Sequence, residues 1–265
     1  MDSENSLKIQ ALRKKIGDNR LIRYLAETSS TNIVAREWAG EGAPDGALVI
    51  AESQTAGRGR KGRTWKSEPG QNLTFSLILR PGSPPDGIQS ITLAGAVSVA
   101  EALEELCAVR CQIKWPNDLW VGGRKICGIL SELVGGNGSP CVIMGIGVNV
   151  LQREFPTELE KVATSVLIET EKTFSRLDLA ACICRRIKAN LLEWEESGFA
   201  AIAEAYRKRT AFLGEWVQIT GLGKDFHVEI TGISDQGALC GIDENGKQIS
   251  IVSGEISVRS VRHEI

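Results

Sequence analysis

The stretch KWPNDLWVGGRKICGILSE, residues 114–132, contains two turn signals set between runs that are typical of β-strands. Pro116 fixes the backbone of the first turn, and the pair Gly122-Gly123 predicts a tight hairpin. Strands are therefore expected near 112–115, 119–121 and 125–134, with a further strand at 141–150. Most of this stretch is predicted to be β-structure.

The chain before and after this stretch mixes strand and helix patterns. Residues 1–20 are polar, with loosely helical apolar spacing, and predict an N-terminal arm or short helix. Short strands are expected at 21–25, 47–52 and 73–79. Helices are expected from an N-cap at Ser30 to Trp38, over 90–107, and after the Ser175-x-x-Asp178 capping signal. This mixture favours a domain of the α/β (α+β) class.

The sequence changes character beyond Gly214. Short β-rich runs separated by glycine turns occur at 216–220, 226–233, 238–242, 248–252 and 256–261. Strands of that length at such even spacing favour a small barrel. We therefore place a domain boundary near residue 213.

Composition excludes several classes of protein. The chain has 265 residues, 31 Lys+Arg against 33 Asp+Glu, a formal net charge of -2 and 42% hydrophobic residues, which is typical of a folded globular protein. Its apolar runs are far shorter than the roughly 18 to 20 residues that cross a bilayer. The start MDSENSLKIQALRKK has no apolar core like that of a secretory signal. We expect a cytoplasmic protein without a membrane partner.

The cysteines and histidines argue against two kinds of catalytic site. Seven cysteines form no C-x-x-C pair, and most lie among Ile, Leu and Val, so we expect reduced thiols in the interior. The only histidines, His227 and His263, lie near the C-terminus. A tightly bound zinc and a Ser-His-Asp triad are therefore disfavoured, and Arg, Lys, Asp and backbone amides must carry the chemistry.

The most unusual segment is the loop that contains GRGRKGR at 57–63. Residues 57–66 hold five positive charges, no acid and three glycines, although the whole chain is slightly acidic. Glycines let backbone N–H groups approach an anion, and arginine offers forked donors that match carboxylates and phosphates. A site for an anionic small molecule and a solvated basic or nucleic-acid-binding turn both fit this pattern. It matches neither a Walker A loop nor a dinucleotide-binding GxGxxG.

A second group of candidates lies in the segment at 114–132. Lys114, Asn117 and Asp118 border the turn at Pro116, where purely structural roles suffice, although a carboxylate near a polyphosphate could also hold Mg²⁺. Lys125 begins an otherwise apolar strand. Desolvation of its ammonium is costly unless an anion neutralises it, which favours a functional role over a surface hairpin.

A third group is uncharged. Ser30, Thr31 and Asn32 open a helix, and Gln54 follows a strand, so together they suit a neutral polar ligand group, although helix capping alone explains the serine. Gly145 and Gly147 lie inside a predicted strand, where glycine usually marks the close approach of another backbone or a ligand.

In combination, three segments resemble the biotin protein ligases. They are AESQTAGRGRKGRTW at 51–65, KWPNDLWVGGRKICGILSE at 114–132 and GIGVNV at 145–150, and the similarity runs from about residue 21 to the end. The resemblance implies a catalytic domain at 21–213 with a mixed sheet covered by helices, and a small SH3-like barrel at 214–265. It also implies that biotin and MgATP give biotinyl-5'-AMP and pyrophosphate. A lysine of a biotin carboxyl carrier domain then accepts the biotinyl group.

The resemblance also assigns expected roles to individual residues. Biotin binding is expected at Ser30, Thr31, Asn32, Gln54, Arg58, Gly59, Arg60 and Lys125, of which Lys125, Arg58 and Arg60 are the expected catalytic residues. ATP or adenylate binding is expected at Gly57, Arg60, Trp65, Lys114, Asn117 and Asn149. Asp118 is the expected Mg²⁺ ligand.

The same residues argue against three other functions. Some relatives carry an N-terminal winged helix-turn-helix, but 20 residues cannot hold one, so no DNA-binding repressor role is expected. A lipoate ligase would show an Arg-Arg…Gly-Gly-Gly signature, which is missing. A biotin carrier would show Met-Lys-Met, whereas the only methionines are Met1 and Met144. The resemblance leaves open whether the chain forms a homodimer.

Overall fold

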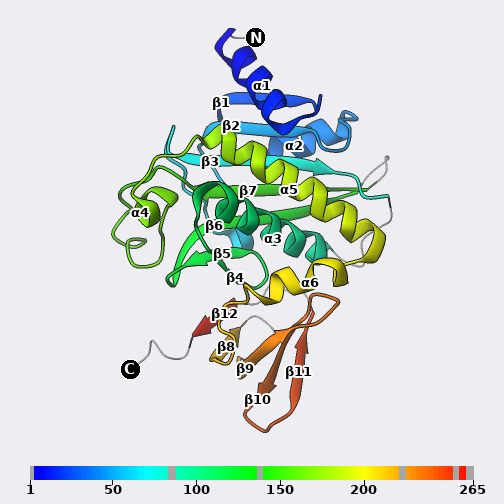
Figure 1. The fold of residues 1–265 in the computed structure, drawn as a ribbon, viewed down its shortest axis with the longest axis vertical. Coiled ribbons are helices and arrows are strands. Elements are labelled where there is room, and N and C mark those ends of the chain that lie inside the picture. Colours follow the sequence, from blue (N-terminus) through cyan, green and yellow to red (C-terminus); the bar gives the residue numbers. More distant parts are fainter. Residues whose placement is uncertain (1–2, 83–87, 136–139, 221–224, 253–256, 261–265) are drawn as a thin grey trace.

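A seven-stranded mixed sheet organises most of the chain in the computed structural model, which describes residues 3–82, 88–135, 140–220, 225–252 and 257–260. Its strand order is β1-β2-β3-β7-β6-β5-β4, in which β1 and β2 are parallel and all other neighbours are antiparallel. The strands are β1 (Ile22–Thr28), β2 (Leu48–Gln54), β3 (Asn72–Leu79), β4 (Gln112–Lys114), β5 (Asp118–Val121), β6 (Arg124–Val134) and β7 (Cys141–Asn149). The predicted fold class and the strand-rich segment at 112–150 are confirmed (Figure 1).

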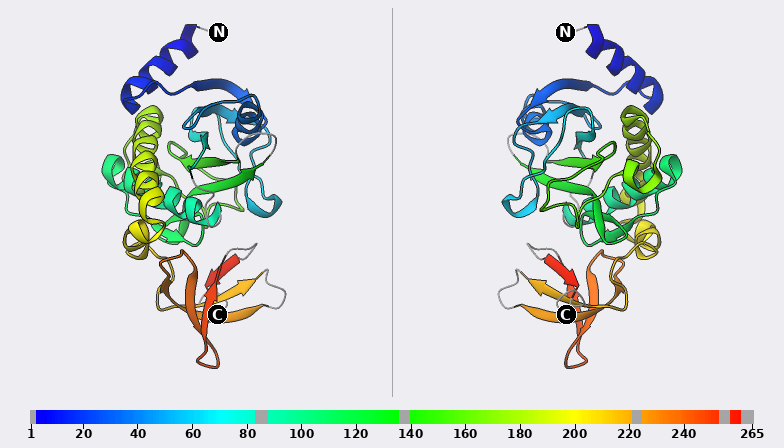
Figure 2. Two further views of the ribbon diagram at one scale, coloured as in Figure 1. Left: turned by 90° about the vertical axis from the view of Figure 1, so that its right-hand side faces the viewer. Right: turned by 90° about the vertical axis from the view of Figure 1, so that its left-hand side faces the viewer.

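Helices cover both faces of this sheet. The long helices α3 (Ile88–Cys107) and α5 (Arg176–Ser197) pack on one face with α1 (Ser3–Ile16), and α2 (Thr31–Gly40) packs on the other (Figure 2). All eight residues of strand β3 are buried. The reason is that a central strand covered on both faces has no solvent side.

The helical predictions are correct in place, with one difference in capping. Ser30 precedes α2 as its N-cap, but its side chain makes no capping hydrogen bond, whereas Ser175 accepts one from the Asp178 N–H at 3.2 Å. Residues 3–16 form the predicted N-terminal helix. Two short helices, α4 (Val166–Thr170) and α6 (Ala200–Arg207), were not predicted.

A second, five-stranded antiparallel sheet lies beyond the β4 edge of the first one (Figure 1). It has the order β11-β10-β9-β8-β12 and comprises β8 (Trp216–Thr220), β9 (Phe226–Ile233), β10 (Leu239–Asp243), β11 (Gln248–Ile251) and β12 (Ser257–Ser260). The expected C-terminal β-rich unit is therefore present, although Ile256 and Val261 of its last predicted strand lie outside the described residues.

The two sheets are joined by direct contacts. The chain leaving α6 pairs with β4, because the Ile113 N–H donates to the Arg209 carbonyl at 2.6 Å and the Ala211 N–H donates back to Ile113 at 3.0 Å. The Trp115 indole donates to the carbonyl of Gly237, in the turn between β9 and β10, at 3.1 Å. The turn at residues 115–118 is thus supported from the C-terminal unit.

The cysteines behave as interior residues. All seven are free, and only Cys240 is partly exposed. Burial raises the pKa of Cys107 and Cys111 to about 12, so these thiols stay protonated at neutral pH. No helix in the described part of the chain is long and apolar enough to span a membrane.

Candidate active site

A cavity of about 610 Å³ opens on the face of the sheet that carries α2, and it gathers nearly all the predicted site residues. Its described lining includes Ser30, Thr31, Asn32, Gln54, Arg58, Gly59, Arg60, Trp65, Lys114, Asn117, Asp118, Lys125 and Asn149. Gly57 is the exception, since it lies behind Trp65 and does not line the cavity. Segments more than 100 residues apart in the sequence therefore meet at one site.

One end of the cavity is built from buried uncharged groups. Gln54, at the end of β2, accepts hydrogen bonds from the Thr31 N–H at 2.8 Å and from its hydroxyl at 3.2 Å. Ser76 of β3 lies 2.7 Å from the Thr31 hydroxyl and donates to Asn32 Oδ1 at 2.6 Å. This network fixes the first turn of α2 against the sheet, where it can offer neutral donors and acceptors to a ligand.

Asn32 is held from the other side by β6. Its Nδ2 donates to Glu132 Oε2 at 2.8 Å and to the Leu130 carbonyl at 3.3 Å. A Cβ atom at Gly145 would lie 2.1 Å from Asn32 Oδ1, so only glycine leaves room for this side chain. The glycine therefore marks a close approach, as predicted, but the approaching group is a side chain and not the expected backbone or ligand.

The arginine-rich loop folds back on itself as a small hairpin. The Gly59 N–H donates to the Arg63 carbonyl at 2.8 Å, the Trp65 N–H donates to the Gly57 carbonyl at 2.9 Å, and residues 60–62 form a single 3₁₀ turn. A Cβ atom at Gly57 would lie 2.3 Å from the Trp65 carbonyl oxygen. Gly57 is thus needed for the closure of the hairpin.

Trp65 lies flat against two glycines of the sheet. A Cβ atom at Gly147 would be 2.4 Å from the Trp65 ring, and one at Gly128 would be 3.3 Å from it. Within the described residues the Trp65 indole N–H is buried and has no hydrogen-bond partner. An aromatic ring with an unused hydrogen-bond donor in a cavity is suited to binding a planar heterocycle.

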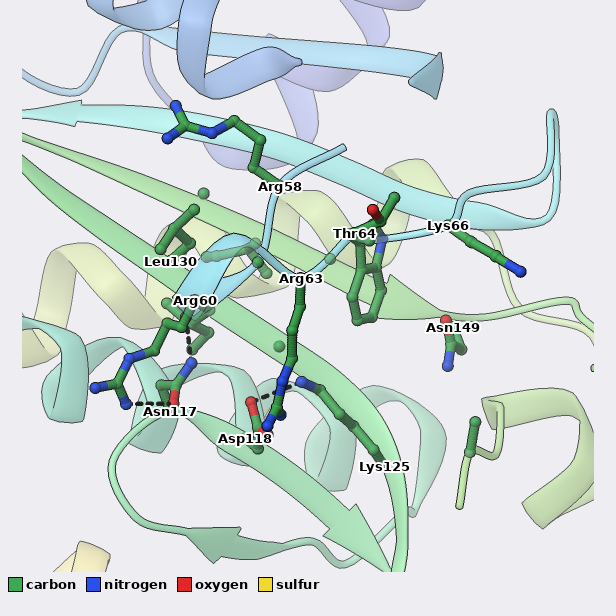
Figure 3. Close-up of a pocket in the computed structure, with 18 of the residues that line it drawn as sticks. Arg58, Arg60, Arg63, Thr64, Lys66, Asn117, Asp118, Lys125, Leu130 and Asn149 are labelled. Atoms are coloured by element: carbon green, nitrogen blue, oxygen red, sulfur yellow. Dashed lines mark hydrogen bonds and ion pairs between the residues drawn. The ribbon is translucent and has the colours of Figure 1, made fainter. Parts of the chain in front are cut away.

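The other end of the cavity is cationic (Figure 3). Lys125 Nζ lies 2.7 Å from Asp118 Oδ1 and 5.7 Å from the centre of the Trp65 ring. Arg60 donates to Asn117 Oδ1 at 3.1 Å, and the exposed Arg63 side chain extends from the loop toward Asp118 and Lys125. The anion expected to neutralise Lys125 is therefore already present as Asp118, across the β5–β6 hairpin.

Two predicted nucleotide-binding residues already have partners in the protein. The Lys114 ammonium lies 4.2 Å from the centre of the Trp120 ring and 5.8 Å from that of Phe212. Asn149 is buried, accepts from Asn72 Nδ2 at 2.9 Å, and donates to the Thr164 carbonyl at 2.9 Å. Asn149 thus ties together the strands beneath the cavity, and Lys114 forms part of its wall.

A divalent cation fits the site only in company with a ligand. The described residues contain no group of three or more His, Cys, Asp or Glu side chains that could hold a metal. Asp118 is a single carboxylate next to Lys125. Mg²⁺ commonly binds through one or two carboxylates together with substrate phosphates, so Asp118 suits that mode and not an all-protein cage.

Comparison with known proteins identifies the family. Residues 24–149 match the Biotin/lipoate A/B protein ligase family, and residues 212–259 match the Biotin protein ligase C terminal domain. The biotin–[acetyl-CoA-carboxylase] ligase of Paracoccus denitrificans is 37% identical over 234 residues, which covers 85% of this chain and 95% of that one. This chain belongs to the biotin protein ligase family.

Other relatives and solved structures agree. The bifunctional ligase/repressor BirA of Bacillus subtilis is 35% identical over 240 residues, covering 89% of this ligase and 73% of BirA. The biotin protein ligase of Aquifex aeolicus in complex with biotin and ATP superposes with a TM-score of 0.82 at 34% identity. That match covers 91% of this chain and 100% of the other. The resemblance found in the sequence is confirmed.

Sequence reasoning missed several side chains that line this ligase's cavity or support the residues that line it. Ser76 and Glu132 contact the predicted α2 residues from strands β3 and β6, and Arg63 was noted only as one loop charge among five. The segment from Phe155 to Ala163 also closes one side. The alternation of strand residues would have indicated Glu132, since it lies on the same face as Gly128 and Leu130.

Proposed function

We propose that this biotin protein ligase uses the cavity to activate biotin with ATP, forming biotinyl-5'-AMP and pyrophosphate, and then transfers biotin to a lysine of a carrier domain. The single observation that carries this assignment is the arrangement of the cavity. A neutral network of the buried Thr31 and Asn32 and the partly buried Gln54 lies beside a cationic cluster at Arg60 and Lys125. A ligand with a neutral ureido ring and a carboxylate tail meets both.

The first half-reaction brings two anions together. The biotin carboxylate oxygen attacks the α-phosphorus of ATP, and the bond to the leaving pyrophosphate breaks. Lys125 and the arginines of the loop offset the repulsion and stabilise the charge that develops. At 4 Å one unit charge pair is worth about 4 kcal/mol at an effective dielectric near 20.

The nucleotide end follows from the remaining groups. Trp65 offers its ring and its unused N–H to a base. Bound Mg²⁺ would neutralise phosphate charge there, with Asp118 as the protein carboxylate that holds it.

The second half-reaction requires protection from water. A mixed anhydride hydrolyses readily, so a loop that covers it preserves the intermediate until the acceptor arrives. The hairpin at 57–65 lies over the cavity and is tied to its floor through Arg60 and Asn117. An unprotonated lysine of the carrier then attacks the acyl carbon, AMP leaves, and an amide forms.

One experiment tests the assignment directly. Pyrophosphate release is measured with biotin, lipoate and octanoate in turn, with and without a carboxyl carrier domain. We expect release with biotin alone and labelling of the carrier only when it is present. Release with lipoate or octanoate, and none with biotin, would contradict the assignment.

The remaining expectations concern partners and location. We expect domains at 21–213 and 214–265, a cytoplasmic enzyme, and a carrier domain as the macromolecular substrate. We propose no DNA-binding role for the described residues, which before β1 form the single helix α1. Salt-sensitive DNA binding would contradict this. Light scattering would decide whether the enzyme is a homodimer.

A further inference from the structure

Glu132 lies beside the cavity and links helix α2 to the arginine-rich loop. Its carboxylate lies on β6, mostly buried, with 17% of the side chain exposed. Three donors converge on it: Asn32 Nδ2 at 2.8 Å on Oε2, Arg36 Nη2 at 2.7 Å on Oε1, and Arg58 Nη1 at 3.5 Å on Oε1. The first two lie one helical turn apart on α2, and the third belongs to the arginine-rich loop.

The chemistry of Glu132 decides how the Asn32 amide is turned. An ionised carboxylate only accepts hydrogen bonds, and the Leu130 carbonyl beside it also only accepts. The Asn32 nitrogen must therefore face β6. A reversed amide would set its oxygen against the carboxylate, where both groups repel.

The opposite atom of the amide is fixed as a consequence. With its nitrogen on β6, Asn32 presents Oδ1 to Ser76, which donates to it at 2.6 Å, and to the space left by Gly145. A neutral ureido group carries N–H donors that need such an acceptor. The orientation of one amide thus decides whether this end of the cavity accepts or donates.

The two arginines make the charge of Glu132 tolerable. A largely buried carboxylate without cations would lose its solvation at considerable cost. Arg36 makes the shorter contact and does not belong to the loop, so Glu132 keeps a cation wherever the Arg58 side chain lies.

We propose that Glu132 is a positioning residue that sets the hydrogen-bonding sense of the biotin end of the cavity by holding the Asn32 amide in one orientation. This inference rests on the proposed function, because it assigns Asn32 to the ureido group. It adds a residue outside the motif positions that the resemblance assigns to biotin.

The test uses Glu132→Gln, which keeps the shape of the side chain but can both donate and accept. Both orientations of Asn32 then become accessible. We expect the Kd for biotin, measured by calorimetry without ATP, to rise about tenfold, while the KM for ATP changes less than about twofold. Equal losses of biotin and ATP affinity, or an unchanged Kd for biotin, would overturn the proposal.

Arg36→Gln is the matched control, because it removes a cation from Glu132 and leaves the Asn32 contact in place. Its effect on the Kd for biotin should stay below about threefold. A loss as large as that of Glu132→Gln would show that charge and not orientation matters. If Glu132→Gln fails to fold, Glu132→Asp replaces it, since the shorter side chain retracts from Asn32 and should also weaken biotin binding selectively.

A double-variant cycle separates orientation from general damage. On an Asn32→Ala background, Glu132→Gln should change the Kd for biotin by less than about twofold, because the amide that it orients is gone. A further tenfold loss would contradict the proposal. Pyrophosphate exchange by the unaltered enzyme is measured in parallel. If biotin supports no exchange there, the proposed function fails and not this inference.

Discussion

The two ends of the cavity solve the problem of holding a ligand in opposite ways. At the α2 end, Thr31, Asn32 and Ser76 are buried, uncharged and bonded to one another or to β6. At the β5–β6 end the groups are cationic and more exposed. Lys125 has 32% of its side chain exposed and is paired with Asp118.

The difference follows from the cost of burying charge. Neutral amides and hydroxyls lose little when they are desolvated, provided that each finds a partner, so they can be fixed before the ligand arrives. An isolated buried ammonium would be far more costly. The cations therefore stay near solvent, where Asp118 and Asn117 hold Lys125 and Arg60 until an anion binds. We propose that the neutral end confers selectivity and that the charged end drives the chemistry.

The largest expected effect tests the charged end. Lys125→Ala should reduce biotin-dependent ATP–pyrophosphate exchange by about 10³-fold, because it removes one charge pair worth about 4 kcal/mol from the transition state. The Kd for biotin measured without ATP should change much less. Exchange at the rate of the unaltered enzyme would contradict the role assigned to Lys125. Lys66→Ala is the control, since that lysine is exposed on the rim and pairs with Glu158.

Substitution of two glycines should perturb the two ends of the cavity separately. Alanine at Gly145 would press on Asn32 Oδ1, and alanine at Gly147 would press on the Trp65 ring, at 2.1 Å and 2.4 Å. Overpacking of this kind costs about 1–3 kcal/mol, or about 5–150-fold in affinity. Gly145→Ala should therefore raise the KM for biotin, and Gly147→Ala the KM for ATP. The two constants are measured in one exchange assay.

Gly40→Ala is the matched control for both glycine variants. It adds the same methyl group at the end of α2, where a Cβ atom meets nothing within 4 Å. Both constants should stay within about twofold of those of the unaltered enzyme. If Gly145→Ala and Gly147→Ala raise both constants together, the cavity does not divide into two independent ends.

A smaller effect is expected from the loop that bridges the two ends. Arg60→Gly removes the hydrogen bond to Asn117 and frees the backbone at the 3₁₀ turn. The loop should then release the adenylate early. We expect the half-life of bound adenylate to fall about tenfold and bystander lysines to become biotinylated. An unchanged half-life would show that the loop is held by its own backbone hydrogen bonds.

The positions of helices and strands could be predicted from the sequence far better than the contacts between side chains that are distant in sequence. Strand and helix positions follow from periodicity and turn residues within short windows, as at Gly122-Gly123 and Ser175. Helices α4 and α6 escaped prediction because five and eight residues carry too little periodic signal. The predicted site residues were located through motifs, and the cavity that gathers them depends on pairings that no local window contains.

Two partners illustrate this limit. The cost of desolvation indicated that Lys125 needs an anion, but not that Asp118 supplies it. That contact depends on a register irregularity between Leu119 and Trp120 in the β5–β6 pairing. Ser76 meets Thr31 across 45 residues of sequence because β3 passes beneath the start of α2. Such contacts are fixed by strand register, which tertiary packing determines.

The smallest effect on activity is expected from an ion cluster on the α5 side of the sheet, which serves as a reference for both ends. Tyr24 donates to Glu52, Lys8 lies 3.3 Å from Glu52 Oε1, and Arg176 Nη2 lies 2.7 Å from Oε2. Burial alone would raise the pKa of Glu52, but the hydrogen bonds from Tyr24 and Arg176 outweigh it and hold the pKa below 4.5.

A lowered pKa in the folded state fixes the sign of the pH dependence. The stabilisation by ionised Glu52 is complete above its unfolded pKa and is lost as the pH falls through the lower folded value. Glu52→Gln should therefore reduce the free energy of unfolding by about 1–2 kcal/mol at pH 7. The difference in free energy of unfolding between the unaltered enzyme and Glu52→Gln, measured by urea denaturation, should narrow below pH 4.5. The KM values for biotin and ATP at pH 7 should change less than about twofold.

Two outcomes would contradict this expectation. A difference in free energy of unfolding that stays constant down to pH 3 would mean that packing and not charge stabilises this cluster. A rise in the biotin constant like that of Gly145→Ala would mean that the α2 end of the cavity depends on the ion cluster around Glu52.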